Sequence, residues 1–103
     1  MKVLEKNIEH IQLIKISFDV NNPRGEKEEQ IVSDPEFKKL TLSIDKFGIL
    51  EPLIVKKDPT KDGFYILIDG ERRLRSAIKV AEQDKGSDQN KTAPVLVAKD
   101  DAD

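Results

Sequence analysis

Residues 68–77 read Ile-Asp-Gly-Glu-Arg-Arg-Leu-Arg-Ser-Ala, and this stretch decides how the chain is interpreted. Residues 64–69 before it form an apolar run that is typical of a strand. Gly70 interrupts that run, and the residues after it predict a helix over 71–83. The apolar face of this helix consists of Leu74, Ala77, Ile78 and Ala81. A strand end, a glycine turn and a helix start therefore follow one another directly, with three arginines in the first turns of the helix.

The start of this helix has the chemistry of an anion site. A helix N-terminus exposes backbone N–H groups and carries a partial positive charge. Gly70 allows close approach to the backbone, and Arg72 and Arg73 carry guanidinium groups that match phosphate oxygens. Arginines here oppose the helix dipole, each by about 0.3–1 kcal/mol, so compensating anions are expected. A bound phosphate satisfies this expectation. A surface ion network with neighbouring carboxylates satisfies it equally well on spacing alone: Asp69, Glu71 and Glu51.

The segments around this stretch predict the rest of the fold. Residues 52–57 predict a strand that forms a hairpin with residues 64–69 through a turn at 58–63. Upstream, Ser33 or Asp34 is expected to cap a helix that begins at Pro35 and stops at Gly48. Its apolar face consists of Phe37, Leu40, Ile44 and Phe47. The outer segments are expected to be a strand with one break (10–18), a polar loop (19–33), a flexible polar loop (84–92), a short strand (94–98) and an acidic, frayed tail (99–103).

This order of elements predicts one α/β domain of the α+β type, with a small mixed sheet and two principal helices. The 103 residues suit a single domain with its core over residues 10–98. The net charge of −2 argues against nucleic-acid binding by bulk charge alone. No apolar run approaches 18 residues, and residues 1–10 lack the apolar region of a signal peptide, so we expect a cytoplasmic protein without a membrane partner. The chain has no cysteine and one histidine, His10, so no disulfide or metal site is expected.

Three segments in register resemble the N-terminal domain of ParB partition proteins, which shares its fold with sulfiredoxin. They are Asn22-Pro23-Arg24, residues 48–55 (Gly-Ile-Leu-Glu-Pro-Leu-Ile-Val) and residues 70–77. The resemblance covers residues 10–98, nearly the whole chain. It implies the ParB/sulfiredoxin fold and a nucleotide-binding module of a DNA-binding protein for chromosome or plasmid partition, associated with the nucleoid or plasmid.

The resemblance also implies roles for individual residues. CTP, with Mg²⁺, would bind with its phosphates at residues 70–73, and Glu71 would align with the acidic residue tied to CTP hydrolysis. Glu71 is thus the candidate catalytic residue, and whether the chain is a CTPase stays open. The candidate nucleotide-binding residues are Gly48, Glu51, Pro52, Gly70, Arg72, Arg73 and Arg75. Two positions depart from the family pattern: Glu51 stands where Gln is usual, and Ser76 where Ala is usual.

The expected partners are a nucleotide and, in the nucleotide-bound state, a second copy of the chain as a homodimer. DNA would be contacted mainly through a domain that is absent from this chain. One alternative is an enzyme of the same fold, either an ATP- or ADP-dependent kinase-like protein or a metal-dependent nuclease, although the missing cysteine argues against sulfiredoxin chemistry. Its carboxylates would be Asp69, Glu71 and Glu51. The other alternative is an interaction domain that has lost its ligand, for which Glu51 is the supporting residue.

Overall fold

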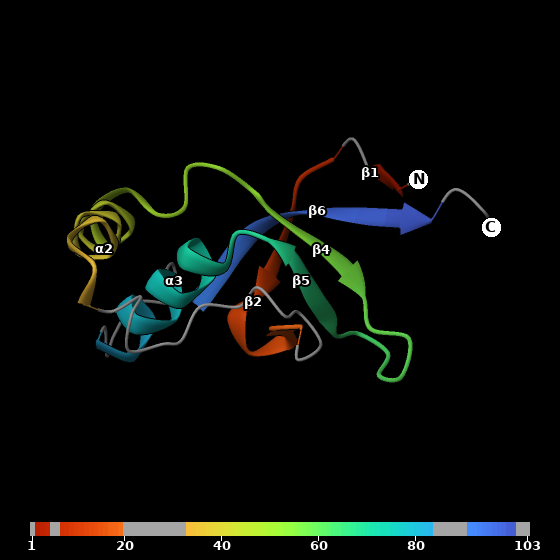
Figure 1. Ribbon diagram of the computed structural model, residues 1–103. Helices are drawn as coiled ribbons and strands as arrows, with labels where there is room; N and C mark the ends of the chain where they lie inside the picture. The colour runs from red at the N-terminus through yellow and green to blue at the C-terminus, as the bar shows by residue number, and fades with distance from the viewer. Residues whose placement is uncertain (1, 5–6, 20–32, 84–90, 101–103) are drawn as a thin grey trace.

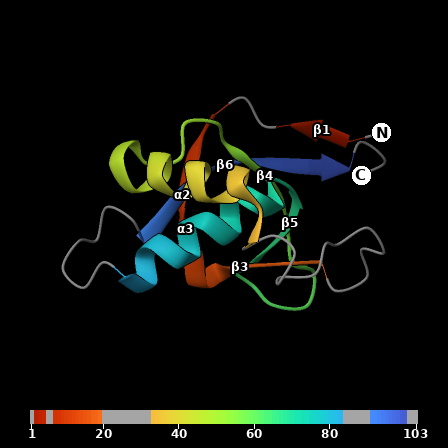
Figure 2. The same cartoon turned by 60° about the vertical axis from the view of Figure 1, so that its left-hand side comes forward.

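The computed structural model describes residues 2–4, 7–19, 33–83 and 91–100 (Figure 1). The strands are β1 (Lys2–Leu4), β2 (Glu9–Gln12), β3 (Ile16–Ser17), β4 (Leu53–Lys57), β5 (Tyr65–Asp69) and β6 (Thr92–Asp100). The α-helices are α2 (Pro35–Phe47) and α3 (Glu71–Gln83), and Leu13–Lys15 form a short 3-10 helix, η1. Figures 1 and 2 show α2 and α3 side by side on one side of the sheet. In the described ranges, no helix has the length and apolar character needed to cross a bilayer.

The strands form one mixed sheet in the order β1-β6-β4-β5-β3, with β2 also paired to β6. β4 and β5 form the antiparallel hairpin that the sequence predicts. β4 is parallel to β6, and β3 is parallel to β5. β1 and β2 run antiparallel to β6 along its other side. The prediction of a small mixed sheet with two principal helices is therefore confirmed.

The sheet has to curl because of the short link between β2 and β3. β2 pairs with β6 and β3 pairs with β5, with β4 between them, so a flat sheet would separate β2 from β3 by about 19 Å. Only η1 joins Gln12 to Ile16, and four residues span at most about 14 Å. The curl brings the two sides of the sheet towards each other and encloses the core.

The core lies between the sheet and α3. Side chains alternate between buried and partly exposed along β4 and β6, so that one face of the sheet contributes Leu53, Val55, Ala93, Val95 and Val97. The helices contribute residues at helical spacing: Leu74, Ala77 and Val80 from α3, and Ile44 from α2. α2 also meets α3 through a polar contact, in which Thr41 Oγ1 lies 3.4 Å from the buried Ser76 Oγ. Burial of these aliphatic side chains is the main source of stability for a core so poor in aromatic residues.

Both helices have the ends that the sequence predicts. Asp34 caps α2, because its Oδ1 accepts a hydrogen bond of 2.9 Å from the Glu36 N–H, and Pro35 occupies the first turn. Gly48 ends α2 with φ 76°, and its N–H donates to the Ile44 carbonyl. α3 begins directly after Gly70 and runs to Gln83.

Two expectations at the outer strands are wrong. The single strand expected over residues 10–18 is two strands separated by η1, because Leu13 turns into the core while Ile14 stays 84% exposed. The tail expected from residue 99 is ordered at Lys99 and Asp100, which extend β6 and pair with β1. β1 itself was not expected, since three residues with no apolar alternation give no strand signal.

Candidate functional site

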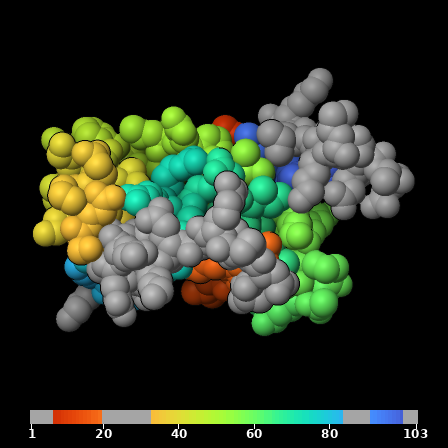
Figure 3. Space-filling view, viewed as in Figure 1, coloured from red at the N-terminus to blue at the C-terminus, as the bar shows by residue number. Residues whose placement is uncertain are grey.

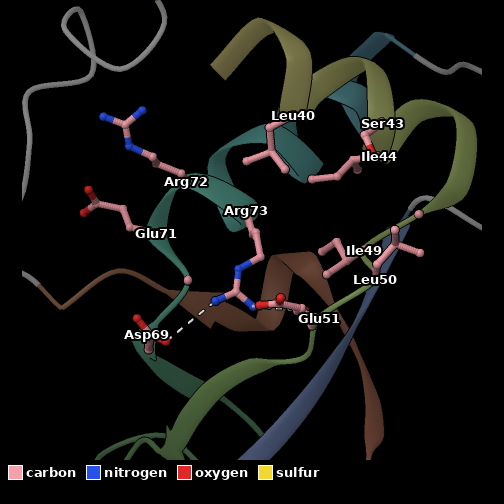
Figure 4. Close-up of a pocket in the computed structure, with 12 residues that line it drawn as sticks. Leu40, Ser43, Ile44, Ile49, Leu50, Glu51, Asp69, Glu71, Arg72 and Arg73 are labelled. Carbon is pink, nitrogen blue, oxygen red and sulfur yellow. Dashed lines mark hydrogen bonds and ion pairs between the residues drawn. The ribbon is translucent and has the colours of Figure 1, made fainter. Parts of the chain in front are cut away.

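A cleft of about 570 Å³ opens between α2, the loop that follows it and the start of α3 (Figure 4). One wall is apolar and comes from α2 and the loop: Leu40, Ile44, Ile49 and Leu50. The opposite wall carries the charged groups: Glu51, Asp69, Glu71, Arg72 and Arg73. In Figure 3 the first turns of α3 reach the surface between α2 and the segment that leads into β4. The cleft therefore combines an apolar surface with a strongly polar one.

Gly70 is required at the turn between β5 and α3 for two reasons. Its φ of 110° lies in the region that disfavours side chains, and a Cβ there would lie 2.7 Å from Leu53 Cδ2, a buried core atom. The first hydrogen bond of α3 joins the Leu74 N–H to the Gly70 carbonyl at 2.9 Å. The N–H groups of residues 71–73 precede that bond and belong to the first turn, which has no carbonyl partners within the helix. This is the backbone geometry of an anion site at the edge of the cleft.

Arg73 holds the two sides of the cleft together. Its Nη1 donates to the carbonyls of Glu51 at 3.0 Å and Pro52 at 2.9 Å, which fixes the segment before β4 to α3. Two carboxylates flank the guanidinium at longer range, Glu51 Oε2 at 3.8 Å and Asp69 Oδ2 at 3.6 Å. Figure 4 shows Arg73 between them. Arg73 thus shapes the pocket wall and also lies between the two carboxylates.

Arg72 also lines the cleft, and its side chain points away from that of Arg73 (Figure 4). Its Nη1 donates to Asp34 Oδ2 at 2.6 Å, which connects α3 to the N-terminal cap of α2. The hydrogen bond from Arg72, with a further one from the Glu36 N–H, lowers the pKa of the Asp34 carboxyl below its usual value. Sequence reasoning placed Asp34 only as a cap; its second role depends on a contact 38 residues away.

Glu71 lines the cleft, whereas Arg75 lies outside it. The Arg75 guanidinium carbon is 4.3 Å from the centre of the Phe18 ring, and its Nη2 is 4.0 Å from Glu71 Oε1. Pro52 contributes its carbonyl to Arg73 and does not line the cleft with its ring. Asn22, Pro23 and Arg24 lie outside the described residues.

The carboxylates around the cleft match the ion network that the sequence left open. Their pairs with Arg73 and Arg75 measure 3.6–4.0 Å, longer than hydrogen bonds, and Glu51 and Asp69 are 82% and 68% exposed. The pairs that Arg73 makes with the exposed Glu51 and Asp69 contribute about 0–1 kcal/mol each, so a stronger anion can displace these two carboxylates. Over the parts of the chain that the structure describes, no three His, Asp or Glu side chains come together as metal ligands. The nuclease alternative therefore finds no ligand set in these parts.

A curled mixed sheet, two helices packed against it and a glycine-led helix start at the edge of a cleft define a small α/β domain of the α+β type. Residues 2–101 match the ParB N-terminal domain, and the chain belongs to this family. This confirms the resemblance noted in the sequence.

The relatives agree with this assignment. The nucleoid occlusion protein of Bacillus subtilis (strain 168) is 30% identical over 84 residues, which are 82% of this chain and 29% of that protein. The C-terminally truncated chromosome-partitioning protein ParB from Caulobacter crescentus, complexed with CTP-gamma-S, superposes with a TM-score of 0.69 at 26% identity over 93% of this chain. The same ParB complexed to the centromeric parS site gives 0.67 at 27% identity over 91% of this chain. The chain spans 47% and 42% of these two ParB chains.

The fold is also that of sulfiredoxin, as expected. Sulfiredoxin from Arabidopsis thaliana superposes with a TM-score of 0.60 over 91% of this chain and 86% of its own. At 21% identity this likeness concerns the fold alone.

Proposed function

We propose that this chain is the CTP-binding domain of a ParB-like partition or nucleoid-associated DNA-binding protein, with the nucleotide in the cleft between α2 and α3. The observation that carries the proposal is the cleft itself, in which an apolar wall faces a glycine-led helix start with Arg72 and Arg73. A nucleotide has the matching shape, with a flat base at one end and phosphates at the other. The CTP-gamma-S complex of the Caulobacter crescentus relative supports the choice of nucleotide.

Different residues of the cleft bind different parts of the nucleotide. The first-turn N–H groups of α3 and the Arg72 guanidinium hold the phosphates, and Arg73 fixes the backbone at Glu51 and Pro52, so that Glu51 stays at the cleft. The apolar side chains of α2 and its following loop receive the base and sugar. Mg²⁺, when bound, neutralises phosphate charge. We assign the general acid–base role in any CTP hydrolysis to Glu71, which lines the cleft beside the phosphate site.

Glu51 is compatible with this proposal. A carboxylate near a triphosphate is repulsive unless a cation lies between them, and Arg73 lies 3.8 Å from Glu51 Oε2 on the side of the helix start. Glu51 is also 82% exposed, so its charge is well screened by solvent.

A thermal-shift panel tests the proposal with CTP, ATP, GTP, UTP, ADP and phosphate, each with and without Mg²⁺. CTP at 100 times its Kd adds about 2.7 kcal/mol, which raises the Tm of a domain this size by about 10–20 °C. Arg72→Ala is expected to abolish the shift. Lys79→Ala, which removes a positive charge further along the same helix, is the matched control and keeps it. A panel with no shift for any nucleotide contradicts the proposal, and a shift with ATP or ADP alone favours the kinase-like alternative.

We further propose that the nucleotide-bound domain pairs with a second copy, and that DNA is contacted mainly outside this domain. Three large apolar side chains stand exposed on α2 and the loop after it: Leu42, Phe47 and Leu50 at 70%, 61% and 75%. Leu50 also lines the cleft, so a second copy covering these side chains would close over the nucleotide. Sedimentation of the chain with and without CTP-Mg²⁺ tests this. A monomer under both conditions contradicts it.

A further inference from the structure

We propose that the Asp34 carboxylate competes with the phosphates of a ligand for the Arg72 guanidinium. Asp34 binds Arg72 when the cleft is empty and thereby weakens anion binding at the start of α3. The inference rests on the proposed function in that it concerns the same cleft. Asp34 acts through Arg72, so it is a positioning residue and not a catalytic one.

The two oxygens of the Asp34 carboxylate have different partners. Oδ1 accepts from the Glu36 N–H at 2.9 Å and caps α2, while Oδ2 accepts from Arg72 Nη1 at 2.6 Å. Both side chains are only partly exposed, Asp34 at 30% and Arg72 at 37%. One carboxylate therefore joins the start of α2 to the start of α3, directly beside the anion site.

This contact differs from the other ion pairs around the cleft. The pairs of Arg73 with Glu51 and Asp69, and of Arg75 with Glu71, lie at 3.6–4.0 Å and are ionic contacts without hydrogen-bond geometry. The Asp34–Arg72 pair is a short, charge-assisted hydrogen bond, which is the stronger kind of interaction. A phosphate that recruits Arg72 has to share or replace this bond in particular.

The consequence for binding follows from charge. A phosphate at the N–H groups of residues 71–73 would interact with the Arg72 guanidinium, whose charge Asp34 already neutralises. The Asp34 carboxylate would also repel that phosphate. Because Oδ1 continues to cap α2, the helix itself persists when Arg72 turns away. Asp34 therefore lowers anion affinity without being needed for the fold of the cleft.

Asp34→Asn tests this directly, because Asn caps helices as well as Asp does but carries no charge. We expect Asp34→Asn to bind inorganic tripolyphosphate, and CTP, about two- to fivefold more tightly by isothermal titration calorimetry, the range for a partly exposed ion pair. Asp34→Ala should show the same tightening with a lower Tm, since it also loses the cap. Asp58→Asn is the matched control. Asp58 is likewise a carboxylate with a lowered pKa, held by Thr60 in its own turn, and it does not line the cleft, so this variant leaves the affinity unchanged.

The outcomes separate this inference from the proposed function. Unchanged or weaker binding of tripolyphosphate by Asp34→Asn overturns the inference, and weaker binding would mean that Asp34 orients Arg72 for the anion. Tighter tripolyphosphate binding with no response to any nucleotide supports the inference and contradicts the CTP proposal. Equal CTP affinity in wild type and Asp34→Asn supports the CTP proposal and overturns the inference. No binding of either ligand to any variant overturns both.

Discussion

At Gly70 two independent constraints meet, a backbone φ of 110° and a core side chain, Leu53, in the space that a Cβ would need. The residue allows α3 to start against the sheet, which places the first-turn N–H groups at the edge of the cleft. The position therefore links the packing of the core to the geometry of the site.

We predict that Gly70→Ala destabilises the domain by about 2–4 kcal/mol, because it combines backbone strain with overpacking. Gly63→Ala is the control: φ is 82° there, but nothing lies within 4 Å of the added Cβ, so strain alone acts. Urea denaturation followed by circular dichroism measures both variants. Equal costs for the two would show that Leu53 moves aside without penalty.

Arg73 is a second residue whose local contacts set the shape of the site. Arg73→Lys keeps the charge but loses the planar group whose Nη1 reaches two carbonyls, so we expect a loss of about 1–2 kcal/mol in the absence of ligand. Arg72→Lys is the matched control on the neighbouring residue. Arg72 donates to the Asp34 carboxylate, which a lysine ammonium can also meet as a point charge, so this variant should cost less. A larger loss for Arg72→Lys in chemical denaturation would contradict this assignment.

At the scale of elements, the start of α2 predicts a pH dependence of stability. Hydrogen bonds from Arg72 and from the Glu36 N–H depress the pKa of Asp34 in the folded state. A depressed pKa stabilises the fold above the unfolded-state value, about 3.9 for Asp. That contribution is lost as the pH falls below this value and through the lower folded pKa.

We therefore expect the urea midpoint of the wild type to fall between about pH 5 and pH 2 more steeply than that of Asp34→Asn. The pKa of Asp58 is also depressed, by hydrogen bonds from the N–H and hydroxyl of Thr60. Asp58→Asn should therefore reduce the pH dependence of stability independently of Asp34. Parallel pH profiles for the wild type and Asp34→Asn would show that the Arg72 contact contributes nothing to stability.

At the scale of the whole molecule, the curled sheet and α3 share one core, in which Leu53, Leu74 and Val95 are fully buried. A shared core predicts that the domain unfolds as one cooperative unit. α2 joins the same unit through Ile44. The cleft between α2 and α3 is thus held open by the core beneath it.

Leu74→Ala is expected to cost about 2–5 kcal/mol, a large part of the total stability of a small domain. Because the core is shared, α3 and the sheet should unfold together. Far-ultraviolet circular dichroism should show one transition, and amide hydrogen exchange should give α3 and the sheet the same free energy of unfolding. Leu42→Ala, at a 70% exposed position on α2, is the control and should change stability by less than about 0.5 kcal/mol. Melting of α3 ahead of the sheet would contradict a single cooperative unit.

Much of the molecule is predictable from local sequence. Asp34-Pro35 and Gly48 mark both ends of α2, and Gly70 marks the start of α3, because caps and glycine turns act within a few residues. The hairpin of β4 and β5 follows from two apolar runs around one turn. The position of the glycine-led helix start at residues 70–73 follows in the same way, and anion binding there stays a prediction.

Other features depend on contacts between distant segments. β1 and the end of β6 form because each provides the other with backbone hydrogen-bond partners. Neither segment therefore has a local sequence pattern that predicts a strand. The break at η1 exists because the chain has to cross from one side of the sheet to the other.

The sequence by itself therefore determined the helices, the hairpin, the fold class and the position of the glycine-led helix start, since short-range periodicity, capping and turn chemistry encode all four. Only the tertiary structure decided what the charged side chains do there. Arg73 donates to the carbonyls of Glu51 and Pro52, and Arg72 donates to the Asp34 carboxylate. Arg75 lies over the Phe18 ring. The physical reason is that an arginine side chain is long and has five donors, so its partner is chosen by whichever oxygen or ring the packing of distant elements brings within reach.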